Sequence, residues 1–238
     1  MDPMTTEPPL LARHLGCGDG LCLSGGAIEL AKEFGSIRFA SWYGHVPTFQ
    51  EIFKDHPEVE VVSVQNEYDM FSKQRSMILT GRYKKPYDYW TIGPGEKVWR
   101  NSGAFDQQFY AEIGVPLQKK WDSFPWKYEG EPVKYDKPYI YVHDDASRGY
   151  IMDLDRIGRH WTQDMMVTPD RELSHSLTWY APFMMGAHEI HTINTCSLWL
   201  ADLIDLPEQQ RKYFHRYAKQ PWEPSDNPTL RHQWIILD

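Results

Sequence analysis

Residues 15–28 read LGCGDGLCLSGGAI, and this stretch guides the interpretation of the whole chain. Glycines at positions 16, 18 and 20 favour a sharp turn, because glycine is costly inside regular elements. Residues 10–15 before it are mostly apolar, and apolar residues recur at helical spacing after it until Gly35, which is placed to end a helix. The stretch therefore predicts strand, glycine turn and helix, which is the opening unit of a doubly wound α/β fold with a ligand at the helix N-terminus.

Several known glycine turns differ from this one in their chemistry. A Walker loop ends in Gly-Lys-Ser/Thr, which the stretch lacks. A dinucleotide fingerprint needs a third glycine, but Leu21 stands at that position. It also needs an acidic residue at the end of the next strand, but the predicted strand ends in Ser41. Residues 15–20 also resemble motif I of S-adenosylmethionine-dependent methyltransferases, although His14 stands in place of the usual acid. A methyltransferase is therefore kept as an alternative.

A further resemblance covers more residues. Gly18 and Asp19, followed by the helical pattern of residues 24–35, resemble the N-terminal motif of heptosyltransferase-like glycosyltransferases. The resemblance implies a compact GT-B fold, with two Rossmann-like lobes and a cleft between them, and a nucleotide-sugar donor. It also implies that Asp19 is the general base, and we assign Gly18 and Gly20 to the donor phosphates. The alternative is that Asp19 only caps the helix.

Composition limits the class of protein. The chain has 238 residues, 41% of them hydrophobic, and no apolar run long enough to span a membrane. Because residues 1–9 lack the features of a signal peptide, we expect a soluble cytoplasmic protein. The cysteines, Cys17, Cys22 and Cys196, are too few for a disulfide scaffold and predict thiols. The net charge of −8 argues against a general binder of nucleic-acid backbones.

The first half of the chain alternates predicted strands and helices, which indicates a parallel sheet. Strands are predicted at residues 36–41, 59–64 and 87–92, and helices at 45–54, 68–79 and 103–113. Basic and aromatic residues interleave at 82–100, where we place the acceptor-binding residues Tyr87, Trp90, Trp99 and Arg100. The alternative is a solvated loop whose aromatic side chains pack inward.

A second α/β series begins after a proline-rich linker. The pattern predicts strands at 139–142 and 164–168 and a helix at 177–185, with a polar loop at 143–149. A strand followed by Ser-Arg-Gly resembles the first loop of the C-terminal lobe of the family, which implies that Ser147 and Arg148 lie near the donor phosphates. The alternative is that Arg148 pairs with Asp144 or Asp145.

The strongest feature of the second half is residues 186–201. They predict a strand at 189–193, a polar turn and a helix from Ser197. The family ends its donor lobe similarly, with an Asp-Thr-Gly turn and a helix carrying His-Leu-Ala, whereas this chain has Asn194, Thr195 and Cys196 in the turn and Trp199 in place of the histidine. Hydroxyl and N–H groups at a helix start suit phosphate or ribose, so we assign Asn194, Thr195, Cys196 and Ser197 to the donor. The alternative is a plain Ser/Thr helix cap.

These patterns together predict a domain organisation. It comprises a tail at 1–9, an acceptor-side lobe at 10–120, a linker at 121–138, a donor lobe at 139–205, and a C-terminal helix and tail at 206–238, with the helix over 206–218.

The function expected from these assignments is transfer of a sugar from a nucleotide sugar to an acceptor hydroxyl, with inversion and without a metal or other cofactor. The acceptor is a glycan, a small molecule or a modified nucleobase. Asp153 and Asp155 form the one Asp-x-Asp pair that resembles a metal motif of GT-A enzymes. A non-catalytic nucleotide- or sugar-binding protein is the second alternative, beside the methyltransferase.

Overall fold

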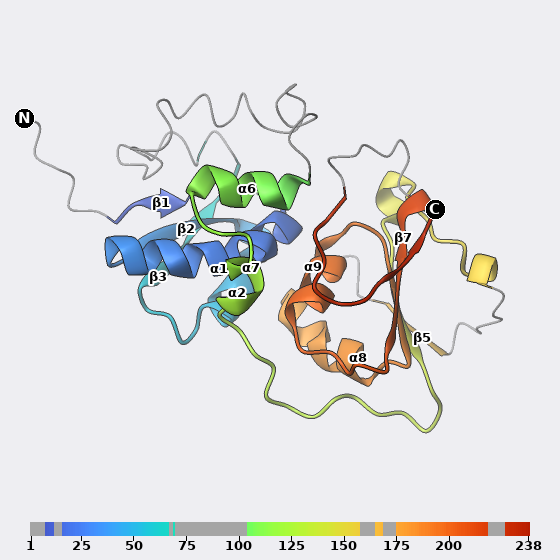
Figure 1. The fold of residues 1–238 in the computed structure, drawn as a ribbon. Coiled ribbons are helices and arrows are strands. Elements are labelled where there is room, and N and C mark those ends of the chain that lie inside the picture. Colours follow the sequence, from blue (N-terminus) through green and yellow to red (C-terminus); the bar gives the residue numbers. More distant parts are fainter. Residues whose placement is uncertain are drawn as a thin grey trace, which may run out of the picture. The chain divides into compact units, whose positions relative to one another are not determined.

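The computed structural model describes residues 8–11, 16–66, 69, 104–157, 165–168, 175–218 and 227–238. The chain divides into unit 1, formed by Met1–Trp126 and Pro224–Thr229, and unit 2, formed by Lys127–Glu223 and Leu230–Asp238. Each unit has a parallel sheet of its own and helices between the strands (Figure 1). The predicted α/β class is therefore confirmed.

The sheet of unit 1 has three strands in the order β1-β2-β3, all parallel. Their bounds are Leu10–Leu11 for β1, Ile37–Trp42 for β2 and Val59–Val64 for β3. Helix α1 (Cys17–Phe34) connects β1 to β2, and η1 (Tyr43–His45) with α2 (Val46–Ile52) connects β2 to β3. The strands predicted at 36–41 and 59–64 and the helix at 45–54 are confirmed. Phe39 of β2 joins the sheet to this connection, because its ring centroid lies 5.0 Å from those of Phe49 and Phe53.

The predicted glycine turn is wrong in its placement. Helix α1 begins at Cys17, so Gly18 and Gly20 lie inside its first turn, and the N-cap is Gly16. Each glycine costs about 1 kcal/mol of helix propensity relative to alanine. Burial of the apolar residues that follow, from Leu21 onward, outweighs that cost. Gly35 ends the helix with φ of +81°, as predicted.

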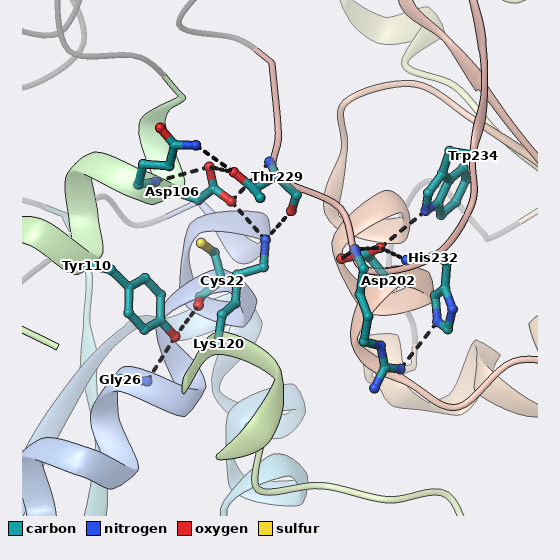
Figure 2. A network of polar contacts seen from close by, with 11 residues as sticks. Cys22, Gly26, Asp106, Tyr110, Lys120, Asp202, Thr229, His232 and Trp234 are labelled. Carbon is teal, nitrogen blue, oxygen red and sulfur yellow. Dashed lines mark hydrogen bonds and ion pairs between the residues drawn. The ribbon is translucent and has the colours of Figure 1, made fainter. Parts of the chain in front are cut away.

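The next glycines of α1 are required by helix packing. Helices α6 (Phe105–Ile113) and α7 (Lys119–Asp122) contact α1 (Figure 1), and α6 confirms the helix predicted at 103–113. A Cβ at Gly25 would lie 2.2 Å from the carbonyl oxygen of Lys119. The Tyr110 hydroxyl accepts a hydrogen bond from the Gly26 N–H and donates one to the Cys22 carbonyl, each 3.0 Å long (Figure 2). Since Cys22 and Gly26 are four residues apart in α1, this hydroxyl bridges a carbonyl and an N–H that normally bond to each other within a helix.

A buried ion pair fixes the C-terminal segment in unit 1. The Lys120 Nζ lies 2.8 Å from Asp106 Oδ2, and both side chains are 0% exposed. The Thr229 N–H donates to the same carboxylate at 3.1 Å, while Lys120 donates to the Thr229 carbonyl (Figure 2). A buried charge is tolerated when it is paired and hydrogen-bonded, so the three residues stabilise one another.

The sheet of unit 2 has five parallel strands in the order β5-β4-β6-β7-β8. Their bounds are Ile140–His143 for β4, Met166–Val167 for β5, Glu189–Thr192 for β6, Arg211–His215 for β7 and Ile235–Leu237 for β8. Counted from β4 within the unit, the order is 2-1-3-4-5, one of the common orders of doubly wound sheets. The strands predicted at 139–142, 164–168 and 189–193 are confirmed.

The helix predicted at 206–218 is wrong, because this segment contains strand β7 followed by η6 (Arg216–Ala218). Charged residues there suggested a solvated helix, but the Lys212 side chain is buried and its Nζ donates to the carbonyls of Pro207 and Gln210. Phe214 is buried in register with Thr192 of β6. Pairing with β6 thus determines the conformation of this segment, whatever its local propensity.

The connections of unit 2 are short helices. Their bounds are Ala146–Arg148 for η2, Leu154–Ile157 for η3, Leu177–Tyr180 for η5, Ala181–Gly186 for α8 and Cys196–Leu203 for α9. The helix predicted at 177–185 is formed by η5 and α8, and the helix predicted from Ser197 begins one residue earlier.

A second buried aspartate holds the segment that precedes the C-terminal strand of unit 2. Asp202 of α9 accepts hydrogen bonds from the backbone N–H groups of Arg231 at 2.8 Å and His232 at 3.2 Å, and from Trp234 Nε1 at 3.2 Å (Figure 2). These contacts fix the segment that leads into β8, a strand that the sequence did not predict.

The element predicted at 87–92, and that predicted at 68–79 apart from Asp69, lie outside the described residues. Within the described part of the chain, no helix has both the length and the apolar character of a membrane span. Cys17, Cys22 and Cys196 are in no disulfide, as their number predicted.

We predict that Gly25→Ala destabilises unit 1. Helix propensity alone would make this change stabilising by about 0.5–1 kcal/mol. The added methyl group instead overlaps a backbone carbonyl oxygen, so we expect the free energy of unfolding to fall by about 1–3 kcal/mol. Urea unfolding measures this change, with Lys32→Ala on the exposed face of α1 as a control that stays within about 0.5 kcal/mol. A gain in stability for Gly25→Ala would contradict the close contact between α1 and α7.

Candidate functional site

The candidate site lies at the carboxyl edge of the unit 2 sheet, where β4 and β6 are neighbours. From β4 the chain continues to β5 on one side, whereas from β6 it continues to β7 on the other. The order of strands therefore reverses between β4 and β6. In open parallel sheets, ligands bind outside the carboxyl ends of the strands at such a switch point.

A side-chain hydrogen bond joins the two strand ends at this point. His143, the last residue of β4, has its Nδ1 2.8 Å from the hydroxyl of Thr195, which follows β6. Burial lowers the pKa of His143 to about 4, although Asp144 and Asp145 act in the opposite direction. The ring is therefore neutral at pH 7 and acts as a fixed hydrogen-bonding group.

The turn after β4 carries Ser147 and Arg148, and Asp145 holds both. The Ser147 hydroxyl donates to Asp145 Oδ1 at 2.6 Å, and the Arg148 guanidinium forms an ion pair with the same carboxylate. This pairing is one of the alternatives that the sequence left open for Arg148. Although burial alone would raise it, the pKa of Asp145 is lowered by its bonds to Ser147 and Arg148. The Arg148 side chain is 63% exposed, so it remains accessible to an anion.

The turn after β6 carries Asn194, Thr195 and Cys196, which are half-buried at the start of α9. Thr195 is the N-cap of α9, but its side chain makes no capping hydrogen bond and contacts His143 instead. The sequence left open that Thr195 only caps the helix through its side chain. The structure shows no such capping bond. The helix start directs its first backbone N–H groups toward the switch point.

Ser197 differs from its neighbours, because its side chain is buried. Its Oγ lies 3.0 Å from the hydroxyl of Tyr141 on β4, and burial raises the pKa of Tyr141 well above its ordinary value. The Ser197 side chain thus ties α9 to the sheet. What Ser197 offers to a ligand is its backbone N–H near the helix start.

The predicted residues of unit 1 are grouped at the start of α1. Gly18, Asp19 and Gly20 occupy its first turn, where a carboxylate interacts favourably with the helix dipole. Asp19 is half-buried, and its carboxylate lies over Gly16, since a Cβ built there would be 2.6 Å from Asp19 Oδ2. Glycine at position 16 therefore leaves room for the carboxylate over the N-cap of α1.

Sequence reasoning missed two features of these edges. His143 was interpreted only as part of a polar turn, although a histidine beside acidic residues at a strand end is a recognisable signal. At the carboxyl end of β2, the rings of Trp42 and Tyr43 lie 4.5 Å apart and Tyr43 is exposed. Adjacent aromatic residues at the end of a predicted strand are the sequence signal for this pair. The predicted acceptor residues Tyr87, Trp90, Trp99 and Arg100 lie outside the described residues.

The Asp-x-Asp pair has a structural arrangement of its own. Asp153 Oδ1 accepts a hydrogen bond from the Asp155 N–H at 3.1 Å, which closes a local turn. Throughout the ranges that the structure describes, no group of three or more His, Cys, Asp or Glu side chains is arranged to hold a metal ion.

The chain matches no protein-family model, no curated protein and no solved structure.

We predict that acid weakens folding through His143. The pKa of a histidine is about 6.5 in an unfolded chain, whereas it is about 4 for His143 and for the buried His215 of β7. As the pH falls between these values, the unfolded state takes up protons first, so the free energy of unfolding decreases with falling pH.

His143→Asn keeps an amide where Nδ1 meets Thr195 but does not titrate. We expect the pH dependence of the unfolding free energy between about pH 6.5 and pH 4 to become shallower, by up to about 1.4 kcal/mol per pH unit. Urea unfolding at a series of pH values measures both slopes. Equal slopes for the two proteins would show that His143 is not held neutral.

Proposed function

We propose that this chain is a glycosyltransferase that binds the diphosphate of a nucleotide sugar at the switch point of unit 2. The observation that supports this most is the convergence of two separate turns on one sheet edge. Ser147 and Arg148 follow β4, Asn194 and Thr195 follow β6, and these strands are direct neighbours. The two sequence stretches assigned to donor phosphates are thus brought together by the strand order.

The chemistry of this edge suits an anion. The first N–H groups of α9 and its helix dipole favour negative charge, and a guanidinium binds phosphate oxygens through paired hydrogen bonds. In the described structure Asp145 is the partner of Arg148. An exposed pair of this kind contributes about 0–1 kcal/mol, so a diphosphate carrying more charge can replace the carboxylate.

The proposed reaction is a single displacement. Asp19 takes the proton of an acceptor hydroxyl, whose oxygen then attacks the anomeric carbon of the donor sugar. The bond from that carbon to the phosphate oxygen breaks, and the nucleoside diphosphate leaves with inversion at the sugar. Arg148 and the start of α9 stabilise the charge that develops on the leaving group, which is why we propose no metal for this step.

Two lines of argument support Asp19 as the base. It stands in the first turn of the helix that follows β1, at the carboxyl edge of the unit 1 sheet, where parallel sheets bind ligands. Its carboxylate is held back over Gly16. A half-buried carboxylate in a defined orientation is suited to accept a proton from a bound hydroxyl.

We predict that nucleotide sugars stabilise the protein and that S-adenosylmethionine does not. A ligand at about 100 times its dissociation constant stabilises the folded state by about 2.7 kcal/mol. Thermal unfolding with a panel of UDP-, GDP-, ADP- and TDP-sugars measures this effect. Stabilisation by S-adenosylmethionine alone would support the methyltransferase instead.

Thermal unfolding of variants with the same nucleotide sugars tests where the donor binds. Arg148→Ala should weaken binding of the stabilising nucleotide sugar by about 10- to 100-fold, because a hydrogen bond to a charged group contributes about 1.5–3 kcal/mol. Asp145→Asn removes the competing charge and should leave binding equal or tighter. Lys127→Ala, an exposed lysine of the same unit, is the control and should not change it. Unchanged affinity in Arg148→Ala would place the donor elsewhere.

We predict that Asp19→Asn abolishes most turnover without loss of stability. Asparagine keeps the size of the side chain in the first turn of α1 and loses its charge, which at a helix start contributes about 0.3–1 kcal/mol, so the unfolding free energy should change by about 1 kcal/mol or less. Loss of the proton acceptor should reduce the rate by about 10²- to 10⁴-fold while donor affinity persists. Gly16→Ala keeps the carboxylate but displaces it, and should also lower the rate. Near-normal turnover in Asp19→Asn would leave Asp19 with a capping role only.

A further inference from the structure

A continuous line of buried polar side chains crosses the unit 2 sheet, and the proposed reaction does not use it. Glu189 Oε2 lies 3.2 Å from His191 Nε2, and His191 Nδ1 lies 3.0 Å from His215 Nε2. His215 Nδ1 lies 3.1 Å from the hydroxyl of Tyr217. The Glu189, His191 and His215 side chains are all fully buried. We name these four residues the polar chain.

The two ends of the polar chain differ in what they contact. At one end, Arg211 Nη2 forms an ion pair with Glu189 at 2.8 Å. At the other end, the Tyr217 hydroxyl accepts from the Asp153 N–H at 2.7 Å and lies 2.9 Å from the Asp153 carbonyl. Asp153 ends the stretch 144–153 that follows β4 and carries Ser147 and Arg148. The polar chain therefore reaches the backbone of the proposed phosphate loop.

Counting hydrogens shows that the polar chain is one proton short. It has four contacts that each need a hydrogen: Glu189 with His191, His191 with His215, His215 with Tyr217, and Tyr217 with the Asp153 carbonyl. With Glu189 ionised, the two neutral imidazoles and the tyrosine supply about one hydrogen each. The single Tyr217 hydrogen must therefore serve either His215 or Asp153.

One added proton removes this conflict. A proton on His215 Nδ1 donates to the Tyr217 oxygen, and the Tyr217 hydrogen is then available to the Asp153 carbonyl. All four contacts are then complete. The protonation state of the histidine pair thus decides whether the Tyr217 hydroxyl donates to His215 or to the Asp153 carbonyl. A hydroxyl that donates to the carbonyl holds Asp153 more firmly.

We propose that the polar chain positions the loop of residues 144–153 through Tyr217, and that one proton taken up by the chain tightens this hold. The role of the loop in binding a nucleotide sugar rests on the function proposed above. His191, His215 and Tyr217 are positioning residues, because they act on the loop and not on the reacting atoms. Since binding and protonation are linked reciprocally, an anion bound to the loop favours the protonated chain.

The surroundings of the polar chain set the pH at which it responds. The charged or titratable groups that face the polar chain from neighbouring elements are Arg211, His188, Asp153 and Arg156. The ring of Tyr213 stacks on His191, and the apolar residues Val142 and Ile235 lie beside these two residues in the sheet. Burial, assisted by Arg156 and opposed by Asp153, lowers the pKa of His215 to about 4. The response is therefore expected on the acid side of neutrality.

Nuclear magnetic resonance of the ligand-free protein tests the coupling without any donor. We expect the Asp153 backbone amide to titrate with the same midpoint as the imidazole nitrogens of His215. Tyr217→Phe should leave the histidine titration in place while the Asp153 amide no longer follows it. Tyr213→Phe, which changes a stacked tyrosine of the same sheet, and His143→Asn, which removes the half-buried histidine at the end of β4, should both retain the coupling.

A second measurement at pH 7 covers variants that unfold in acid. Amide hydrogen exchange at Asp153 should be faster in Tyr217→Phe than in the wild type or Tyr213→Phe. The proposal is overturned if the Asp153 amide does not follow His215 in the wild type, or follows it equally in Tyr217→Phe. Equal exchange of Asp153 in the two phenylalanine variants at pH 7 would also overturn it.

Donor binding separates this proposal from the proposed function. UDP-glucose is a suitable probe, because its phosphates are diesters and lack the second ionisation near about pH 6. Its affinity should rise several-fold as the polar chain takes up its proton, and Tyr217→Phe should remove this rise. If UDP-glucose affinity follows pH equally in Tyr217→Phe, the loop is not positioned by the polar chain. If Asp153 follows His215 but no nucleotide sugar binds, the coupling stands and the glycosyltransferase function fails.

Discussion

Parallel pairing is the constraint on which the structure depends. All named strand pairs of the described residues are parallel, in the sheet of unit 1 and in that of unit 2. Parallel neighbours cannot be joined by a tight hairpin, so each connection must return across the sheet. The carboxyl ends of the strands, and the turns that follow them, therefore gather at one edge of each sheet. Both candidate sites follow from this geometry.

Buried charged residues have structural roles in both units. Asp106 with Lys120 receives the backbone of Thr229 in unit 1, whereas Asp202 receives the N–H groups of Arg231 and His232 in unit 2. A buried carboxylate is costly unless its oxygens are bonded, and backbone N–H groups satisfy it with defined geometry. These aspartates therefore fix the positions of Thr229, Arg231 and His232 within their own units through directional hydrogen bonds, which apolar contacts do not provide.

The proposed donor edge combines a rigid part with an exchangeable one. The His143–Thr195 contact and the buried Tyr141–Ser197 pair fix the strand ends and the start of α9. The Arg148 guanidinium, in contrast, is held by an exposed ion pair that a stronger anion can replace. This division suits the proposed anion binding, since the helix start is preorganised and the guanidinium can exchange its carboxylate partner for a phosphate.

The sequence by itself determined the elements whose local pattern and final environment agree. The β-branched run at 59–64 and the helix ended by Gly35 are examples, because each depends on nearest neighbours. The turns that follow β4 and β6 were also located correctly from sequence. Only the tertiary structure decided the rest. Residues 211–215 form a strand because β6 supplies a partner, and Gly25 serves helix packing because the α7 backbone approaches it. Strand order placed the two turns together, and order depends on contacts between distant segments, which no local pattern encodes.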